Sequence, residues 1–425
     1  MTQYADVIAS SVLEEFRKLP AKRKPSVREN GLHEWVPLSG IVAKGPRSLK
    51  CVALATGMKC LPASKLPQAN GMAIHDWHAE VLALRTFNQF VLQECHRLTC
   101  GGQSEFLRRR TDLELAPHKE NNSRDTPWNG QPFAWREDVT LHMYCSEAPC
   151  GDASMELIMA AQDNVSPWAI PPTLSQTPAQ APDPVALSLP GRAYFSHLGV
   201  VRRKPARGDA PPTLSKSCSD KIALKQCTSL LSSLAALLVS PHNVYLTSLI
   251  LPESQYSATA CRRCFSADVP EGRMSALAER EWAGSGYAFV PFRVETTGLE
   301  FDFSKRVVAA RSDKTSASNL AAAWVRDGIE EGLIGGVMQG RKHFDLRGAS
   351  AVSRRRMWGL AIEIGGSLGA SIDDGIVGVL AAGTYDEVKE GVLLEARRKV
   401  KDETRRDALK GWIRNMGDGG FSRGL

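Results

Sequence analysis

The triplet His78-Ala79-Glu80 has the side chains and the spacing of a metal site that activates water. The imidazole of a histidine can bind zinc, and a carboxylate two residues later can reach a metal-bound water without occupying a coordination position. Such triplets also arise by chance, so the triplet alone is weak evidence. His75 lies one helical turn earlier without a carboxylate two residues after it, and we interpret it as a loop histidine.

Cys150 is the second candidate ligand. It follows an apolar run and precedes a run of helical character, in the sequence Pro149-Cys150-Gly151. The positive potential at a helix N-terminus favours the thiolate, which is the form of cysteine that binds metal. A buried structural cysteine is the competing interpretation. Because a catalytic zinc site has three protein ligands and a water, a third ligand is required.

The third ligand is sought among the remaining cysteines. Cys218 stands out because it lies, within the sequence SCSDK, just before a strongly helical run. Cys145 is the nearest rival, but it lies in a predicted strand, where its side chain can point away from Cys150. Cys261 and Cys264 have C-x-x-C spacing without a second pair, and we interpret them as part of a basic helical segment.

The elements that must position these residues alternate between strands and helices. Alternating apolar residues predict strands within residues 34–60, at residues 138–146 and at residues 243–252, together with an apolar-aromatic stretch at residues 287–295. Helical periodicity predicts helices around residues 12–16, 78–95, 153–162, 219–238 and 386–415. Strand followed by helix, repeated along the chain, is typical of an α/β sandwich.

We expect a single domain over residues 1–425, with a zinc-site core at about residues 50–255 and residues 256–425 completing it. Two stretches read as surface inserts. Residues 101–131 are polar and contain three consecutive arginines, and residues 166–190 are rich in Pro, Ala, Ser and Gln. The sequence contains no internal repeat.

The composition indicates a folded chain in a reducing compartment. Hydrophobic residues make up 43% of the 425 positions, and ten irregularly spaced cysteines follow an N-terminus without a signal-peptide pattern. No apolar stretch is long enough to cross a bilayer, so we expect an intracellular protein of the nucleus, the cytoplasm or both. The net charge of +7 suits a polyanionic partner such as nucleic acid.

The motifs HAE, PCGDAS and SCSDK, in this order, resemble the deaminase domain shared by adenosine deaminases acting on RNA and the eukaryotic tRNA-specific adenosine deaminases. The resemblance extends from EWVPLSGIV and TGMKC to TYDEVK and GWI. It implies a cytidine-deaminase-like three-layer fold, a mixed sheet with helices on both faces and a basic helical C-terminal extension. It also implies that Cys218 is the third zinc ligand. Ala153 separates this chain from relatives that use P-C-x-x-C.

The resemblance implies a reaction as well as a fold. Zinc held by His78, Cys150 and Cys218 would activate a water for attack on C6 of adenine. Glu80 would take the proton of that water and return protons to the ring and the leaving amine, so that ammonia departs and adenosine becomes inosine. The target base must leave its stack to reach the pocket, which a splayed anticodon loop allows.

The expected substrate is the adenosine at position 37, next to the anticodon of alanine tRNA, and no obligatory protein partner is evident. No room for double-stranded-RNA-binding domains precedes EWVPLSGIV, which ranks an enzyme editing messenger or double-stranded RNA second. A catalytically silent fold that binds RNA or polyphosphate is the third hypothesis. Lys59 matches a family residue near the substrate, and basic clusters at residues 202–204, 262–263 and 354–356 could contact phosphates.

The resemblance also implies inositol hexakisphosphate as a buried cofactor, linked to zinc through the lysine of SCSDK. Residues that match its contacts are Arg85, Lys221, Tyr385, Lys389, Lys399 and Trp412. Leu84 and Leu224 stand where editing relatives carry arginines, which changes the set of contacts. From residue types alone, a buried cluster of lysines and a basic surface helix cannot be distinguished.

Overall fold

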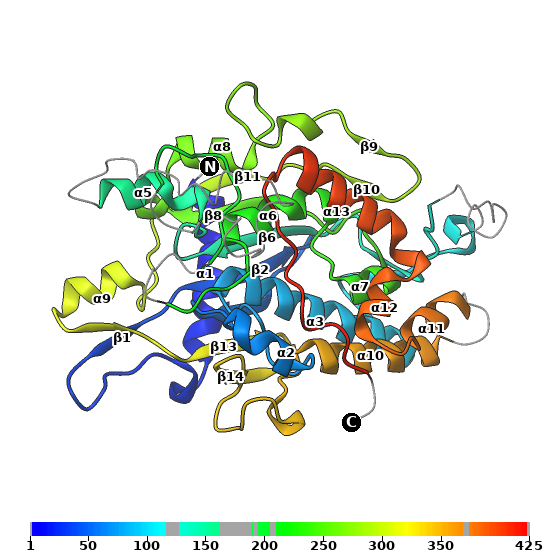
Figure 1. Cartoon of the computed structure of the whole chain (residues 1–425), viewed down its shortest axis with the longest axis horizontal. Coiled ribbons are helices and arrows are strands. Elements are labelled where there is room, and N and C mark those ends of the chain that lie inside the picture. Colours follow the sequence, from blue (N-terminus) through cyan, green and yellow to red (C-terminus); the bar gives the residue numbers. More distant parts are fainter. Residues whose placement is uncertain are drawn as a thin grey trace.

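A mixed sheet of eight strands forms the centre of the computed structural model, which describes residues 2–115, 127–161, 189, 194–204, 210–368 and 374–422 (Figure 1). The strand order is β11-β8-β6-β2-β3-β13-β14-β15. The bounds are β2 (Leu38–Lys44), β3 (Leu49–Thr56), β6 (Thr140–Cys145), β8 (Leu246–Pro252), β11 (Arg293–Thr297), β13 (Ala321–Val325), β14 (Glu330–Ile334) and β15 (Val337–Met338). The pairs β6–β8 and β8–β11 are parallel, and the other neighbours are antiparallel.

Three small sheets accompany the main one. The first pairs β1 (His33–Trp35) with β12 (Thr315–Ala317), and the second pairs β9 (Glu281–Trp282) with β10 (Tyr287–Ala288). The third contains β4 (Leu107–Arg109), β5 (Phe133–Trp135) and β7 (Val239–Ser240). The described part of the predicted insert at residues 101–131 therefore contains one strand, β4, which pairs with β5 just beyond it. The predicted insert at residues 166–190 lies, apart from residue 189, outside the described residues.

Helices cover both faces of the central sheet. The helix α1 (Thr2–Lys18) packs on one face, where Ile8, Val12 and Phe16 are buried against β2, β3 and β8. The helix α3 (Ala79–Thr99) packs on the other face, against β2, β3 and β13. The remaining helices are α2 (Leu66–Ala69), α5 (Met155–Ala160), α6 (Cys218–Thr228), α7 (Ser233–Leu238), α8 (Ala258–Phe265), α9 (Lys305–Arg311), α10 (Arg354–Ser367), α11 (Asp374–Leu380), α12 (Tyr385–Glu390) and α13 (Glu395–Asp407). The predicted α/β sandwich is confirmed.

The C-terminal helices add a further layer outside α3 and α6. The helix α10 packs on α3, and α13 packs on α6. Figure 1 shows α11, α12 and α13, in orange and red, along one side of the molecule. The main hydrophobic core contains residues from Ile41 to Phe421, so both parts of the predicted domain contribute to it. The single-domain organisation itself stays a prediction.

Two predicted helices are interrupted. The helix expected over residues 219–238 breaks at Ser229, whose φ of 55° lies in the left-handed region and ends α6. The helix expected over residues 386–415 breaks at Gly391, where the chain becomes extended between α12 and α13. A Cβ at Gly391 would lie 2.8 Å from Cγ1 of Val379, so the close approach of α11 requires glycine. None of the described helices is long and apolar enough to traverse a lipid bilayer.

The contact between α1 and the sheet yields a prediction on stability. A Cβ at Gly40 of β2 would lie 2.5 Å from Cγ1 of Val12, so Gly40→Ala overpacks this contact. We expect Gly40→Ala to lower the free energy of unfolding by about 1–3 kcal/mol, as overpacking does elsewhere. Val12→Ala removes the clashing methyl groups, so the double variant should be more stable than the sum of the two single changes implies. Urea unfolding of the four proteins measures this coupling, and strict additivity would refute the contact.

Candidate active site

Three residues that the sequence places far apart meet at one point. His78 is the N-cap of α3, Cys150 follows β6, and Cys218 is the first residue of α6. Their ligand atoms lie within 4.8 Å of one another, and Nδ1 of His78 lies 3.7 Å from Sγ of Cys150. One imidazole and two thiols converging in this way form a tripod that leaves a fourth position open, which is the arrangement of a catalytic zinc site.

Hydrogen bonds and nearby charges favour a thiolate at this point. The pKa of Cys150 is held well below its usual range because the thiol of Cys218 donates to it and the ammonium group of Lys204 attracts it, although burial acts in the opposite direction. The backbone amide of Cys218, at the N-terminus of α6, lies 3.4 Å from the sulfur of Cys150. Burial raises the pKa of Cys218, and the neighbouring Cys150 raises it further. Of the two cysteines, Cys150 is therefore the one in which the thiolate is favoured.

Glu80 lies in the first turn of α3 and is 4% exposed. Burial, followed by the nearby Cys150, raises the pKa of its carboxyl group above the usual value. A carboxyl group with a raised pKa accepts and releases a proton more readily at neutral pH than an exposed one. The geometry thus gives Glu80 the properties of a proton-transfer group beside the three candidate ligands.

A chain of buried charges leads away from Cys218. The ammonium group of Lys204 lies 3.2 Å from Sγ of Cys218 and 2.9 Å from Oδ2 of Asp76. The same carboxylate accepts hydrogen bonds from Lys221 and from the hydroxyl of Ser215. Burial disfavours the charge on Asp76, but Lys204 and Lys221 outweigh it and lower its pKa. The sequence analysis missed both Asp76 and the role of Lys204.

The basic clusters expected to contact RNA are internal only in part, because Arg202 and Lys204 are buried whereas Arg262 and Arg356 are exposed. Arg202 and Lys204 are 0% and 3% exposed, respectively, so neither can reach a phosphate at the surface. Arg263 forms ion pairs with Asp152 and Glu156. Arg354 donates to the backbone carbonyl of Asp418. The sequence could not show this, because the carboxylates and carbonyls that pair with these cations come from distant segments.

Two adjoining cavities, of about 340 and 220 Å³, lie beyond Lys221. The residues that line both are Val81, Arg85, Lys221, Arg354 and Trp412. Tyr385 lines the larger one, so four of the six residues expected to hold a polyphosphate do surround one space. Leu84 and Leu224 line it too, at the positions where editing relatives carry arginines.

The other two expected contacts, Lys389 and Lys399, lie elsewhere. The ammonium group of Lys389 pairs with Asp386 one helical turn earlier. Lys399 lines a separate cavity of about 640 Å³ beside Trp282. On α13, residues 397, 401 and 405 repeat every four positions and share the face that lines the polyphosphate cavity, whereas residue 399 points to another face. The expected residue on this helix, Lys399, is therefore two positions before Lys401, which does line the cavity.

Unpaired positive charge distinguishes this cavity. Burial and the neighbouring Arg397 and Arg405 lower the pKa of Lys401 to about 7. Its ammonium group has no hydrogen bond or ion pair with any residue in the described part of the chain. Burial and Lys221 lower the pKa of Lys216, also at the cavity, to about 7. Arg397, Lys401 and Arg405 lie four residues apart on α13, where like charges repel one another. This spacing of cations was the signal in the sequence that could have indicated an anion site.

Lys59 is exposed at the edge of the segment that precedes the site. Its backbone carbonyl accepts a hydrogen bond of 3.0 Å from the amide of Trp77, next to His78. Its ammonium group contacts the side-chain carbonyl of Asn319. Lys59 thus lies near the candidate metal ligands.

Comparison with known proteins agrees with this geometry. The sequence model of the adenosine-deaminase (editase) domain matches residues 53–416. The chain is 33% identical over 419 residues to tRNA-specific adenosine deaminase 1 of Schizosaccharomyces pombe, which covers 97% of this chain and 95% of that protein. It is 32% identical over 250 residues to the protein of the same name in Saccharomyces cerevisiae, covering 58% of each.

A more distant similarity links the chain to enzymes named for another substrate. It is 26% identical over 277 residues to the double-stranded RNA-specific editase Adar of Drosophila melanogaster, which covers 61% of this chain and 35% of that protein. The family match over most of the sequence and the similarity to relatives of nearly the same length lead to one conclusion: the chain belongs to the adenosine-deaminase (editase) domain family and is an enzyme that acts on adenosine.

Proposed function

We propose that this protein is a zinc-dependent deaminase that converts the adenosine at position 37 of alanine tRNA, next to the anticodon, to inosine. The observation that carries the proposal is the convergence of His78, Cys150 and Cys218 beside the buried carboxyl group of Glu80. The names of the two fungal relatives support tRNA as the substrate. The overall reaction consumes one water and releases one ammonia.

The donor set fits zinc. One imidazole and two thiols are ligands that zinc accepts in a tetrahedral site, and a thiolate is already favoured at Cys150. When bound, zinc would supply the Lewis acidity that activates a water at neutral pH. Glu80 would accept one proton from the water and donate it to N1 of the purine, and would then carry the second proton, from the hydroxyl group added at C6, to the leaving amine. The raised pKa of Glu80 suits this two-way transfer.

The burial of Glu80 also sets a condition on the substrate. A carboxyl group that is 4% exposed cannot reach an adenine that remains stacked in a helix. Anticodon loops hold unstacked bases, so they present an adenine at lower cost than a duplex does. Lys59, exposed beside the segment that leads to His78, is placed to contact a phosphate flanking the target nucleotide.

We also propose that the basic cavity holds inositol hexakisphosphate or a polyanion of the same charge and size. Arg85, Lys221, Arg397, Lys401 and Arg405 would pair with its phosphates. The fit rests on like charges gathered in one cavity, where burial and the neighbouring Arg397 and Arg405 lower the pKa of Lys401 to about 7. Such a ligand would have a structural role and would take no part in the reaction, because Lys221 and Asp76 lie between the cavity and the candidate metal ligands.

The substrate proposal is tested with unmodified alanine tRNA. The purified protein should form inosine next to the anticodon, and Glu80→Ala should lower the turnover by at least about 10²-fold, the usual share of a general acid-base group. The variant should keep its zinc, because Glu80 is not a ligand. A perfectly paired RNA duplex is the control substrate. Inosine in the duplex but not in the tRNA would contradict the proposal and favour an editing enzyme.

The cavity proposal is tested by a pair of lysines on one helix. Lys401→Gln removes a cation from the cavity and should weaken the binding of inositol hexakisphosphate, measured by calorimetry, by about tenfold or more, as expected for a lost buried hydrogen-bonded charge. Lys399→Gln is the matched control, because this exposed lysine lies outside the cavity and should leave the affinity unchanged. Equal effects of the two substitutions would be evidence against the assigned site.

The lowered pKa of Lys401 predicts that the free energy of unfolding depends on pH in protein that has been freed of polyanions. Between about pH 7 and its ordinary value near 10.4, the lysine is neutral in the folded chain and charged in the unfolded chain, so stability rises with pH. Lys401→Gln removes this contribution. We expect the variant to be the more stable protein at pH 7, with an advantage that shrinks by at most about 1.4 kcal/mol per pH unit as the pH rises to 9. An advantage that grows with pH would reverse the assigned sign.

A further inference from the structure

Each of the two candidate sulfur ligands is followed two residues later by a fully buried aspartate. Cys150 precedes Asp152 and Cys218 precedes Asp220, and both aspartates are 0% exposed. A buried carboxylate is costly unless a positive charge and hydrogen bonds compensate it. The groups that compensate the two carboxylates therefore show what the aspartates do in the structure.

Asp152 is held by Arg263 of α8. Nε of Arg263 donates to Oδ2 of Asp152 at 3.0 Å, and Nη2 donates to the backbone carbonyl of the same residue at 3.1 Å. The other carboxylate oxygen, Oδ1, accepts the amide of Gly199 at 2.9 Å. Glu156, one turn later, completes the contacts of the guanidinium group. Arg263 therefore forms hydrogen bonds with both the side chain and the main chain of the loop that carries Cys150.

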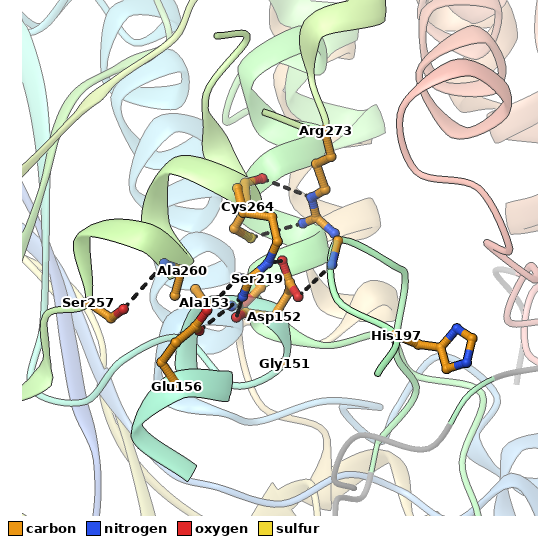
Figure 2. A network of polar contacts seen from close by, with 12 residues as sticks. Gly151, Asp152, Ala153, Glu156, His197, Ser219, Ser257, Ala260, Cys264 and Arg273 are labelled. Carbon is orange, nitrogen blue, oxygen red and sulfur yellow. Dashed lines mark hydrogen bonds and ion pairs between the residues drawn. The ribbon is translucent and has the colours of Figure 1, made fainter. Parts of the chain in front are cut away.

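Asp220 is held by Arg273 in the segment after α8. Nη1 of Arg273 lies 2.7 Å from Oδ1 of Asp220, and the arginine side chain is 5% exposed. Its Nε donates to the carbonyl of Cys264 at 2.8 Å, and its Nη2 lies 3.1 Å from the sulfur of Cys264 (Figure 2). The hydroxyl of Ser217 donates to Oδ2 of Asp220 at 2.6 Å. Arg273 is thus fixed on one side by α8 and on the other by the start of α6.

The two arginines belong to one rigid unit. The amide of Arg273 donates to the carbonyl of Arg263 at 3.0 Å. The two cysteine loops are also joined directly, because the hydroxyl of Ser219 lies 2.8 Å from the carbonyl of Pro149 and accepts the amide of Ala153 at 3.1 Å. Figure 2 shows Ser219, Ala153 and Asp152 gathered at this junction. These hydrogen bonds therefore connect the loop that carries Cys150, the start of α6 that carries Cys218, and the segment that carries both arginines.

We propose that Arg263 and Arg273 act together as positioning residues that set the separation and direction of the Cys150 and Cys218 sulfurs. The inference rests on the proposed zinc centre and names the groups that hold its two thiol ligands in place. Partners that orient metal ligands affect affinity because a ligand that must reorganise binds less tightly. The planar guanidinium group is required at both positions, since an ammonium group cannot reach with one nitrogen the separate acceptors that the Nε and Nη atoms of each arginine contact.

The test replaces each arginine by lysine, which keeps the positive charge and removes the planar, forked arrangement of N–H donors. We expect Arg263→Lys and Arg273→Lys to weaken zinc affinity, measured by competition with a chelator, by about 10–100-fold, the range seen when outer partners of metal ligands are lost. In the cobalt-substituted proteins, the visible d–d absorption should shift, because the angle between the sulfurs changes. Arg262→Lys is the matched control: it adjoins Arg263 on α8, is 56% exposed and pairs with Glu271, so it should change neither readout.

Three outcomes separate the possibilities. Folded variants with lowered melting temperature but wild-type zinc affinity and cobalt spectrum would overturn the inference and leave the zinc centre intact, because a merely structural role moves stability alone. A wild-type protein that binds no zinc would refute the metal centre and the inference with it. If Arg273→Lys does not fold, Arg263→Lys carries the test, since that side chain is 13% exposed and lies nearer the surface.

Discussion

The ammonium group of Lys204 is the buried charge on which the arrangement of the active site depends. It is 3% exposed and lies between the sulfur of Cys218 and the carboxylate of Asp76. A buried cation in this position requires the carboxylate of Asp76 as its counter-charge. Asp76 in turn accepts the backbone amide of His78 at 3.0 Å, so the same carboxylate that balances Lys204 also fixes the residue that opens α3.

This arrangement connects the two functional parts of the molecule. Asp76 also pairs with Lys221, whose side chain reaches the basic cavity under α13. Within the cavity, backbone carbonyl groups at and just after the end of α6 accept hydrogen bonds from some of the cations. Lys225 donates to the carbonyl of Leu230, and Arg397 donates to the carbonyl of Thr228. Lys401 has no such partner among the described residues, which leaves positive charge for an anion to neutralise. The C-terminal helices thus support the site through charge as well as through packing.

Local patterns in the sequence predicted the parts of the site that lie at the ends of elements. His78 at the start of α3 and Cys218 at the start of α6 could be proposed because a helix start leaves a visible signature. The alternation of strands and helices predicted an α/β sandwich, and the resemblance to the deaminase family implied the mixed sheet with helices on both faces. The resemblance to the deaminase family, rather than the spacing of cysteines, was needed to prefer Cys218 as the third ligand.

Long-range pairing explains what the sequence did not reveal. Lys204 resembled a surface lysine within a basic cluster, and only the fold brings it to Asp76 and Cys218. Lys399 was expected at the cavity from the family resemblance, whereas Lys401 shares the face of α13 that lines the cavity with Arg397 and Arg405. Arg263 and Arg273 were likewise indistinguishable from exposed arginines until their buried aspartates were in view.

The central claim is that His78, Cys150 and Cys218 together form one zinc centre. Zinc-edge X-ray absorption of the purified protein tests it most directly. The account predicts one zinc per chain with one nitrogen ligand at about 2.0–2.1 Å and two sulfur ligands at about 2.3 Å, and loss of one sulfur from the first shell in Cys218→Ser. A shell without nitrogen, or two sulfurs that persist in Cys218→Ser, would place the metal elsewhere and contradict the account.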